Sequence, residues 1–281
     1  GGVVRVTESG LGCPDWPLCK GQLIPEFEFH VLIEYSHRLL ASIVAILILI
    51  QGGLLWRRYS DVKRIVVPGI LSVVFLIIQI ILGGITVLNE LPPSIVTVHL
   101  AVSQVIFALL LAILILGWTK NHQEGSPIDQ TNAASSSALY TCTIIAALGV
   151  YVITISGSYV VGANAGFVCS TWPLCNGGFL PEGNLSWIHM SHRLIAGIIG
   201  VVVLWCALLS WRERMNSQLI ARVGLLVAVL LILQILVGAS NVWTGLHPIL
   251  RVLHLALATC LWGGLVTLGL LIYRNRVNPS S

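Results

Sequence analysis

Residues 13–19 read Cys-Pro-Asp-Trp-Pro-Leu-Cys, and residues 169–175 read Cys-Ser-Thr-Trp-Pro-Leu-Cys. Each segment precedes an apolar stretch that contains Ser-His-Arg-Leu, at 36–39 in the first case and at 191–194 in the second. The cysteines are offset by 156 positions (169 − 13) and the histidines by 155 (192 − 37). A fixed offset of this kind indicates that one structural unit occurs twice in the chain.

The repeat continues downstream and places a second histidine in each copy. His99-Leu-Ala recurs as His254-Leu-Ala, and Gln79 recurs as Gln234. Four histidines therefore occupy matching positions inside apolar segments: His37, His99, His192 and His254. Ionisable side chains are rare in such segments and usually functional.

The composition indicates a membrane protein. Hydrophobic residues make up 56% of the 281 residues, charged residues only 9%, and the mean hydropathy is +0.92. Several apolar runs approach the roughly 20 residues that a helix needs to cross a bilayer. We expect seven spans, at about 32–56, 66–88, 95–118, 139–161, 188–211, 219–243 and 249–273.

Basic residues cluster at alternate ends of these spans. They are Arg57, Arg58, Lys63, Arg64, Lys120, Arg212, Arg214, Arg222, Arg274 and Arg276. The positive-inside rule assigns that side to the cytoplasm and both cysteine segments to the extracytoplasmic side of the cell membrane. Short clusters at span ends do not form one basic face, so the charge pattern argues against nucleic-acid binding.

The repeat predicts an all-α polytopic fold of two tandem four-helix bundles related by a pseudo-two-fold axis along the membrane normal. Gly1 aligns with Gly157, near the end of a span, and only the second copy has an apolar stretch before that point. We therefore expect one further helix ahead of Gly1. The predicted units are an amino-terminal half-bundle at 1–118, a polar cytoplasmic linker at 119–138 and a carboxy-terminal bundle at 139–276.

Four of the seven cysteines form two Cys-x5-Cys pairs, Cys13 with Cys19 and Cys169 with Cys175. An oxidising compartment permits disulfides there. A structural staple is the favoured interpretation of the second pair, whereas a redox function is equally compatible with the first. A zinc or copper site is disfavoured because the Cys-x2-Cys spacing is absent.

The four repeated histidines fit the axial ligation of two planar iron cofactors. Haem needs strong axial ligands, a flat apolar slot and positive charge near its propionates. Four-helix bundles provide such slots between facing helices. Arg38 and Arg193 directly follow His37 and His192, and are candidates for the propionate contacts. The alternative is that each histidine is a hydrogen-bonded packing residue.

The repeat breaks at Glu34. This carboxylate lies three residues before His37 and hence on the same helix face, but the corresponding residue before His192 is His189. A carboxylate near the apolar edge of a membrane is costly unless it is protonated or paired. Glu34 is therefore a candidate for proton transfer. The alternative interpretation is an interfacial salt bridge to Arg38 at i+4.

The chain resembles the haem A synthase family. The resemblance rests on residues 2–19, on Glu34-Tyr-Ser-His-Arg38, and on His99, His192-Arg193 and His254. It implies two four-helix bundles and the oxidation of a methyl group of haem O to the formyl group of haem A. By resemblance, His37 and His99 receive the substrate haem O, and His192 and His254 hold a haem b cofactor. Glu34 matches the family's functional carboxylate, and Cys13 and Cys19 match its outer cysteine pair.

The resemblance also extends to partners. It implies haem O as substrate, and it makes haem O synthase, an electron-transfer protein and a second copy of the chain candidate partners within the lipid bilayer. Two other classes of protein remain open from the residues alone. One is a di-haem electron-transfer cytochrome, which would need no carboxylate on the haem face. The other is a transporter or haem-handling chaperone built on parallel repeats, which would need helices broken at mid-membrane.

Overall fold

The computed structural model describes residues 1–118, 133–178 and 181–277 of the chain. Seven of its helices are long and apolar enough to cross a membrane, as the sequence predicted. These are α2 (Phe29–Tyr59), α3 (Lys63–Leu88), α4 (Pro93–Trp118), α5 (Ala133–Gly162), α6 (Asn184–Arg212), α7 (Gln218–Trp243) and α8 (Pro248–Val277). The short helices are α1 (Gly2–Val6) and the single turns η2 (Ala165–Phe167) and η3 (Glu213–Met215).

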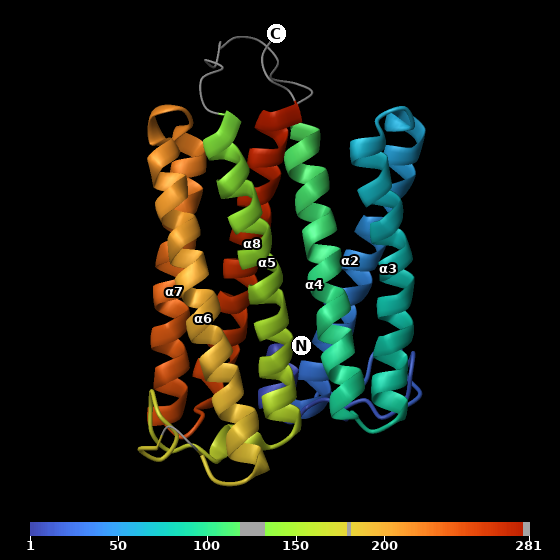
Figure 1. The fold of residues 1–281 in the computed structure, drawn as a ribbon. Helices are drawn as coiled ribbons and strands as arrows, with labels where there is room; N and C mark the ends of the chain where they lie inside the picture. The colour runs from blue at the N-terminus through green and yellow to red at the C-terminus, as the bar shows by residue number, and fades with distance from the viewer. Residues whose placement is uncertain (119–132, 179–180, 278–281) are drawn as a thin grey trace.

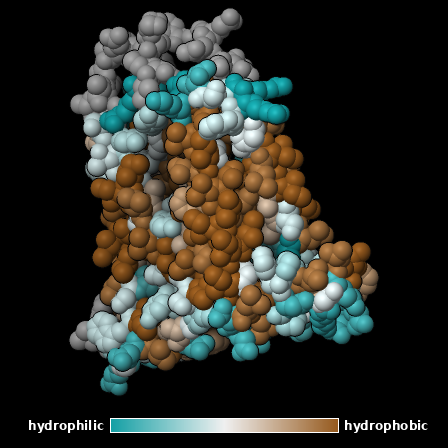
Figure 2. All heavy atoms as spheres, turned by 90° about the vertical axis from the view of Figure 1, so that its right-hand side faces the viewer, coloured by the Kyte–Doolittle hydropathy of each residue, from teal (hydrophilic) through white to brown (hydrophobic). Residues whose placement is uncertain are grey.

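The long helices run side by side and cross the molecule from one end to the other (Figure 1). The shortest of them have 26 residues, hence a length of about 39 Å at ~1.5 Å per residue, which exceeds the ~30 Å hydrocarbon core of a bilayer. Figure 2 shows a broad apolar belt between two polar ends. The all-α, multi-pass expectation is confirmed.

Helices α5 to α8 form a four-helix bundle. Each of them packs along two neighbours in the order α5, α6, α7, α8 and back to α5, so α6 and α8 lie diagonally opposite each other. The largest apolar core of the described chain lies here, and Val203, Val227, Leu265 and Leu268 are fully buried in it.

The first half repeats this arrangement with α2, α3 and α4. Helix α3 packs between α2 and α4, which are therefore diagonal like α6 and α8. The short helix α1 contacts α2 and α8, and it aligns in sequence with the last turn of α5. The apolar core of this half is smaller and centres on Ile48, Leu76 and Ile106.

The two halves meet through residues that the repeat relates to each other. Gln104 of α4 donates from Nε2 to the Oγ1 atom of Thr259 of α8 (3.0 Å), and these two positions are separated by the repeat offset of 155. The Tyr151 hydroxyl of α5 donates to the carbonyl oxygen of Ala101 of α4 (3.2 Å). The contact between equivalent positions indicates a pseudo-two-fold axis that passes between α4 and α8.

The predicted linker at 119–138 is longer than the structure allows. Helix α5 begins at Ala133, so the last six of those positions (133–138) are helical, and 119–132 lie outside the described residues. The residues from 133 to 138 are mostly alanine and serine. Alanine has the highest helix propensity, and a chain segment joined to an apolar helix extends that helix at little cost because the nucleus already exists.

Candidate functional site

The four repeated histidines lie at one end of the two bundles, the end that also has both cysteine loops. His37 and His192 are each the ninth residue of their helix, α2 and α6. His99 and His254 are each the seventh residue of α4 and α8. His37 and His99 thus lie on diagonal helices of the first half, and His192 and His254 lie on diagonal helices of the second.

A glycine of a neighbouring helix lies against each imidazole. A Cβ atom added to these glycines would lie close to the Cε1 atom of the histidine: 3.6 Å for Gly1 and His37, 3.4 Å for Gly83 and His99, 3.3 Å for Gly157 and His192, and 3.0 Å for Gly238 and His254. At Gly157 and Gly238 the glycine lets the ring approach the adjacent backbone more closely than a larger residue would, whereas at Gly1 and Gly83 an added Cβ would make an ordinary contact. The positions are again related by the repeat.

Ser156 is the hydrogen-bond partner of His192. The Ser156 hydroxyl lies 2.8 Å from the carbonyl oxygen of Ile153 and 2.8 Å from His192 Nδ1, and it can donate its single proton to only one of them. When the hydroxyl donates to Ile153, it accepts the Nδ1 proton of His192, and Nε2 keeps its lone pair. A metal-ligating histidine needs this arrangement, in which one ring nitrogen donates to a partner and the other binds the metal.

His254 and His99 have their Nε2 lone pairs directed at glutamines. Gln234 Nε2 donates to His254 Nε2 (3.4 Å), and Gln79 Nε2 donates to His99 Nε2 (3.1 Å). The Nδ1 atoms of both rings and the Oε1 atoms of both glutamines are buried without a partner in the described chain. Buried polar atoms without partners are rare in folded proteins. An iron ligated by Nε2 would take the place of the glutamine donor, so ligation requires Gln79 and Gln234 to turn away from the rings.

Glu34 and Arg38 form an ion pair beside His37. Arg38 Nε donates to Glu34 Oε1 (3.0 Å), and the side chains are only 16% and 6% exposed. This is the salt bridge that the alternative interpretation of Glu34 predicted. It leaves Glu34 buried three residues from His37, where it also remains a candidate for proton transfer.

The guanidinium of Arg38 mainly holds the first cysteine loop. It donates to the carbonyl oxygens of Cys13 (2.7 Å), Asp15 (2.8 Å) and Leu18 (2.7 Å) in addition to Glu34. These bonds occupy Nε and both Nη atoms. These contacts use four of the five guanidinium N–H groups, so one N–H on Nη2 is left for the propionate contact that the sequence suggested.

The second bundle differs at both of these positions. His189, which replaces Glu34, is buried and donates from Nδ1 to the carbonyl of Ala165 (3.0 Å). Arg193 donates through Nη1 alone to the carbonyls of Thr171, Pro173 and Leu174. Its Nη2 atom is buried without a partner in the described chain. One arginine donor thus stays available in the second bundle.

Each cysteine loop is closed by a disulfide, Cys13–Cys19 and Cys169–Cys175. Inside the first loop, Asp15 accepts from the backbone N–H groups of Lys20 and Gly21 (2.5 and 2.7 Å). The hydrogen bond from Gly21, followed by that from Lys20, lowers the pKa of the Asp15 carboxyl below its ordinary value. The neutral Asn176 holds the second loop, because its Oδ1 accepts from Ser170 N (2.9 Å).

Sequence reasoning missed two kinds of residue at this end of the molecule. Ser156 is bonded to His192 Nδ1, and a serine in an apolar helix gives no sequence signal of that contact. Arg5 and Arg251 also lie near the histidines. Neither has a basic counterpart in the repeat, because Arg5 corresponds to Val161 and Arg251 corresponds to Val96. The same kind of break drew attention to Glu34, so a full comparison of the two copies would have found both arginines.

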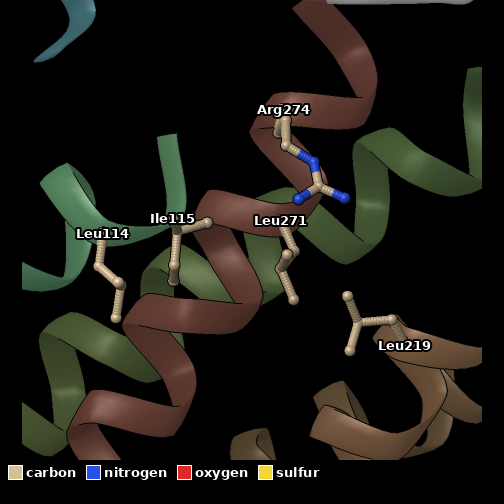
Figure 3. Close-up of a pocket in the computed structure, with 5 residues that line it drawn as sticks. All are labelled: Leu114, Ile115, Leu219, Leu271 and Arg274. Atoms are coloured by element: carbon tan, nitrogen blue, oxygen red, sulfur yellow. The ribbon is translucent and has the colours of Figure 1, made fainter. Parts of the chain in front are cut away.

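Two cavities of the described chain lie at the opposite end of the bundles. One, of about 280 Å³, is lined by Leu114, Ile115, Leu219, Leu271 and Arg274 (Figure 3). The other, of about 320 Å³, adjoins it at Leu114. No histidine lines either cavity. Within the described residues no three His, Cys, Asp or Glu side chains gather as a metal site, so the candidate centres consist of two imidazoles each.

These features define a multi-pass, all-α membrane protein with two histidine couples inside duplicated bundles, a ligand set that suits an iron porphyrin better than a free metal ion. The comparison with protein families agrees. The chain belongs to the family described as cytochrome oxidase assembly protein, whose model matches residues 1–28 and 24–266.

Individual relatives cover nearly the whole chain. A protein named heme A synthase from Geobacillus kaustophilus is 32% identical over 291 residues, which span 99% of this chain and 88% of the relative. Heme A synthases from Geobacillus thermodenitrificans and Lysinibacillus sphaericus are 31% and 29% identical, over 100% and 99% of this chain and 88% and 91% of their own lengths.

Proposed function

We propose that this protein is a haem A synthase, an oxidoreductase that converts a ring methyl group of haem O to the formyl group of haem A within the membrane. Its relatives bear the name heme A synthase over nearly their full lengths. The observation that supports the proposal most directly is the asymmetry of the two sites, since a buried carboxylate stands beside the histidine couple in only one of them.

Because the two sites differ, we assign a different haem to each bundle. The substrate haem O binds between His37 and His99, next to Glu34. A resident haem b binds between His192 and His254. A haem b supplies one-electron redox chemistry when bound, and the protein contributes ligation, orientation and electrostatics. The Nδ1 proton of His192, bonded to Ser156, keeps Nε2 available as an iron ligand.

Glu34 is the proposed acid–base group. It lies one helical turn from His37 and accepts a hydrogen bond from Arg38, which is itself held by three loop carbonyls. The loop therefore fixes the arginine, and the arginine holds the carboxylate in place one turn from His37. A positioned carboxylate that receives a proton from the reacting group contributes about 10²–10⁴-fold to a rate.

The topology follows from the charge distribution. The basic ends of α2, α6 and α8 face the cytoplasm of a cell membrane, and both cysteine loops face the extracytoplasmic side. In that setting the partners are haem O synthase, which supplies the substrate, and an electron-transfer protein at the extracytoplasmic face. A second copy of the chain is a further candidate partner.

Analysis of extracted pigment tests the proposal. The protein is produced together with a haem O supply, and its haems are extracted and identified. Haem A in the extract is the expected result. An extract with haem b alone would favour the di-haem cytochrome instead. The Glu34→Gln variant should keep its bound haem and lose at least about a hundredfold in haem A formation. Full activity of that variant would remove Glu34 from the mechanism.

A further inference from the structure

Two arginines outside the repeat lie between the bundles at the level of the histidines. Arg251 is three residues before His254 in α8, hence on the same side of the helix and one turn nearer its outer end. Arg5 lies in α1, whose Gly2 packs against the Leu255 side chain of α8 (3.3 Å from an added Cβ). Since α1 and α8 are in contact here, the two guanidinium groups lie near each other.

Arg5 is fixed in place by the second bundle. Its Nη1 donates to the hydroxyl of Ser158 (3.0 Å), and its Nη2 donates to the carbonyl of the same residue (3.2 Å). The Ser158 hydroxyl is also bonded to Thr97, two residues before His99. Ser158 is buried and directly follows Gly157, which packs against His192. Arg5 is therefore anchored between the two histidine couples, since Gly1 of the same segment packs against His37.

Neither arginine has a carboxylate partner among the residues that the structure describes. Burial lowers the pKa of Arg5, and the positive charge of Arg251 lowers it further. Two like charges held together in a partly buried place are unfavourable unless an anion neutralises them. Guanidinium groups are also the side chains best suited to bind carboxylates through paired hydrogen bonds. The arrangement thus favours a carboxylate ligand.

We propose that Arg5 and Arg251 together bind a propionate carboxylate of the porphyrin held between His192 and His254. This inference rests on the proposed function and deepens it. Arg38 and Arg193, the arginines next to the repeated histidines, instead hold the cysteine loops through three carbonyls each. The spare Nη2 of Arg193 is compatible with a second, weaker contact. The first bundle has valine at the position of Arg251, so its porphyrin lacks this anchor.

The difference has a functional consequence. A resident cofactor has to stay bound through many turnovers, whereas a substrate has to leave as product. A carboxylate anchor in the second bundle slows dissociation of the porphyrin there. The absence of its counterpart at Val96 lets the first bundle exchange its porphyrin.

The test compares haem b with its dimethyl ester, in which both propionates are esterified and uncharged. Full-length protein purified without haem is placed in lipid nanodiscs and titrated with each porphyrin, and the tighter site is followed by its absorption. For Arg251→Gln we expect the dissociation constant of haem b to rise about tenfold or more, as for the loss of a charge-assisted hydrogen bond. The constant for the ester should not change. Arg5→Gln should show the same pattern with a smaller rise, and Arg251→Lys should recover part of the affinity.

Arg222→Gln is the matched control, since it removes the same charge at the opposite end of the molecule. It should affect neither porphyrin. The inference is overturned if Arg251→Gln binds haem b as tightly as the wild type, or if it weakens the acid and the ester equally. The His254→Ala variant distinguishes failure of the arginine anchor from failure of the proposed function. If that variant loses the tighter site while Arg251→Gln does not, only the arginine anchor fails. If the wild-type protein binds no haem, the proposed function itself fails.

Discussion

The first and second bundles share a skeleton and differ in their charges. Both place a histidine nine residues into one helix and seven into the diagonal one, with a glycine against each ring and a glutamine on the second imidazole. In the first bundle an acid–arginine ion pair stands beside the couple. In the second bundle the imidazole of His189, bonded to a carbonyl, takes the place of the acid.

This comparison separates the features that both copies share from those that only one copy has. Under the proposed function, the imidazoles, glycines and glutamines, which both copies share, serve porphyrin binding at both sites. Under the same proposal, Glu34 in the first copy and Arg251 in the second serve what only one site does. The two copies thus share a geometry around the imidazoles and differ in a few charged side chains.

The largest difference between the copies should be the loss of unfolding free energy when Arg38 or Arg193 is replaced. Arg38→Leu leaves Glu34 buried without its partner, which typically costs about 3–5 kcal/mol of unfolding free energy. Arg193→Leu removes only hydrogen bonds to loop carbonyls, a loss of about 1–3 kcal/mol. Unfolding by SDS in mixed micelles measures both. The double variant Arg38→Leu with Glu34→Leu should recover stability, and equal losses in the two single variants would contradict the assigned difference.

An intermediate effect is expected at the glycines beside the imidazoles. In Gly238→Ala the new Cβ would lie 3.0 Å from His254 Cε1, tighter than ordinary contact, whereas in Gly83→Ala it would lie 3.4 Å from His99 Cε1. Overpacking of a close contact costs about 1–3 kcal/mol, so haem b affinity in the second bundle should fall about tenfold or more in Gly238→Ala. Gly83→Ala should change porphyrin affinity in the first bundle by less than about threefold. Titration of haem into the apoprotein measures both affinities. A larger loss of affinity in Gly83→Ala than in Gly238→Ala would contradict the prediction and show that the rings move freely.

The smallest effect concerns pH and the cysteine loops. The lowered pKa of Asp15 means that its hydrogen bonds stabilise the first loop above the ordinary aspartate pKa and are lost as the pH falls through the lowered value. Asn176 does not titrate, so the second loop should be indifferent to pH. Reduction by a phosphine between pH 7 and pH 3, followed by mass spectrometry, gives the ratio of Cys13–Cys19 to Cys169–Cys175 cleavage. That ratio should rise only at the acid end, and Asp15→Asn should abolish the rise.

Much of the fold could be predicted because the membrane restricts it. Apolar runs of spanning length, basic residues at alternate ends and a repeat of fixed offset are all linear features, and the seven spans are confirmed. The start of α5 could not be placed, since the Ala- and Ser-rich residues 133–138 are compatible with either a linker or a helix. The break at Glu34 identified a candidate site residue from sequence alone.

The partners of the arginines could not be predicted. Arg38 and Arg193 were expected to face a cofactor because they adjoin the histidines, yet neighbours in a helix point in different directions, and both side chains reach back to the cysteine loops. Arg5 meets Ser158 across 153 positions of sequence. A contact over that separation depends on how α1 packs against α5 and α8, which no local pattern specifies.

The order of residues by itself determined that this protein crosses a bilayer seven times within the described chain and presents paired imidazoles in two copies, because hydropathy and period are properties of the linear chain. The folded arrangement decided that Ser156 bonds to His192, that Arg38 and Arg193 bind loop carbonyls, and that Arg5 bonds to Ser158 of the second bundle. Those outcomes depend on hydrogen bonds between distant helices, and their geometry exists only once the bundles have packed.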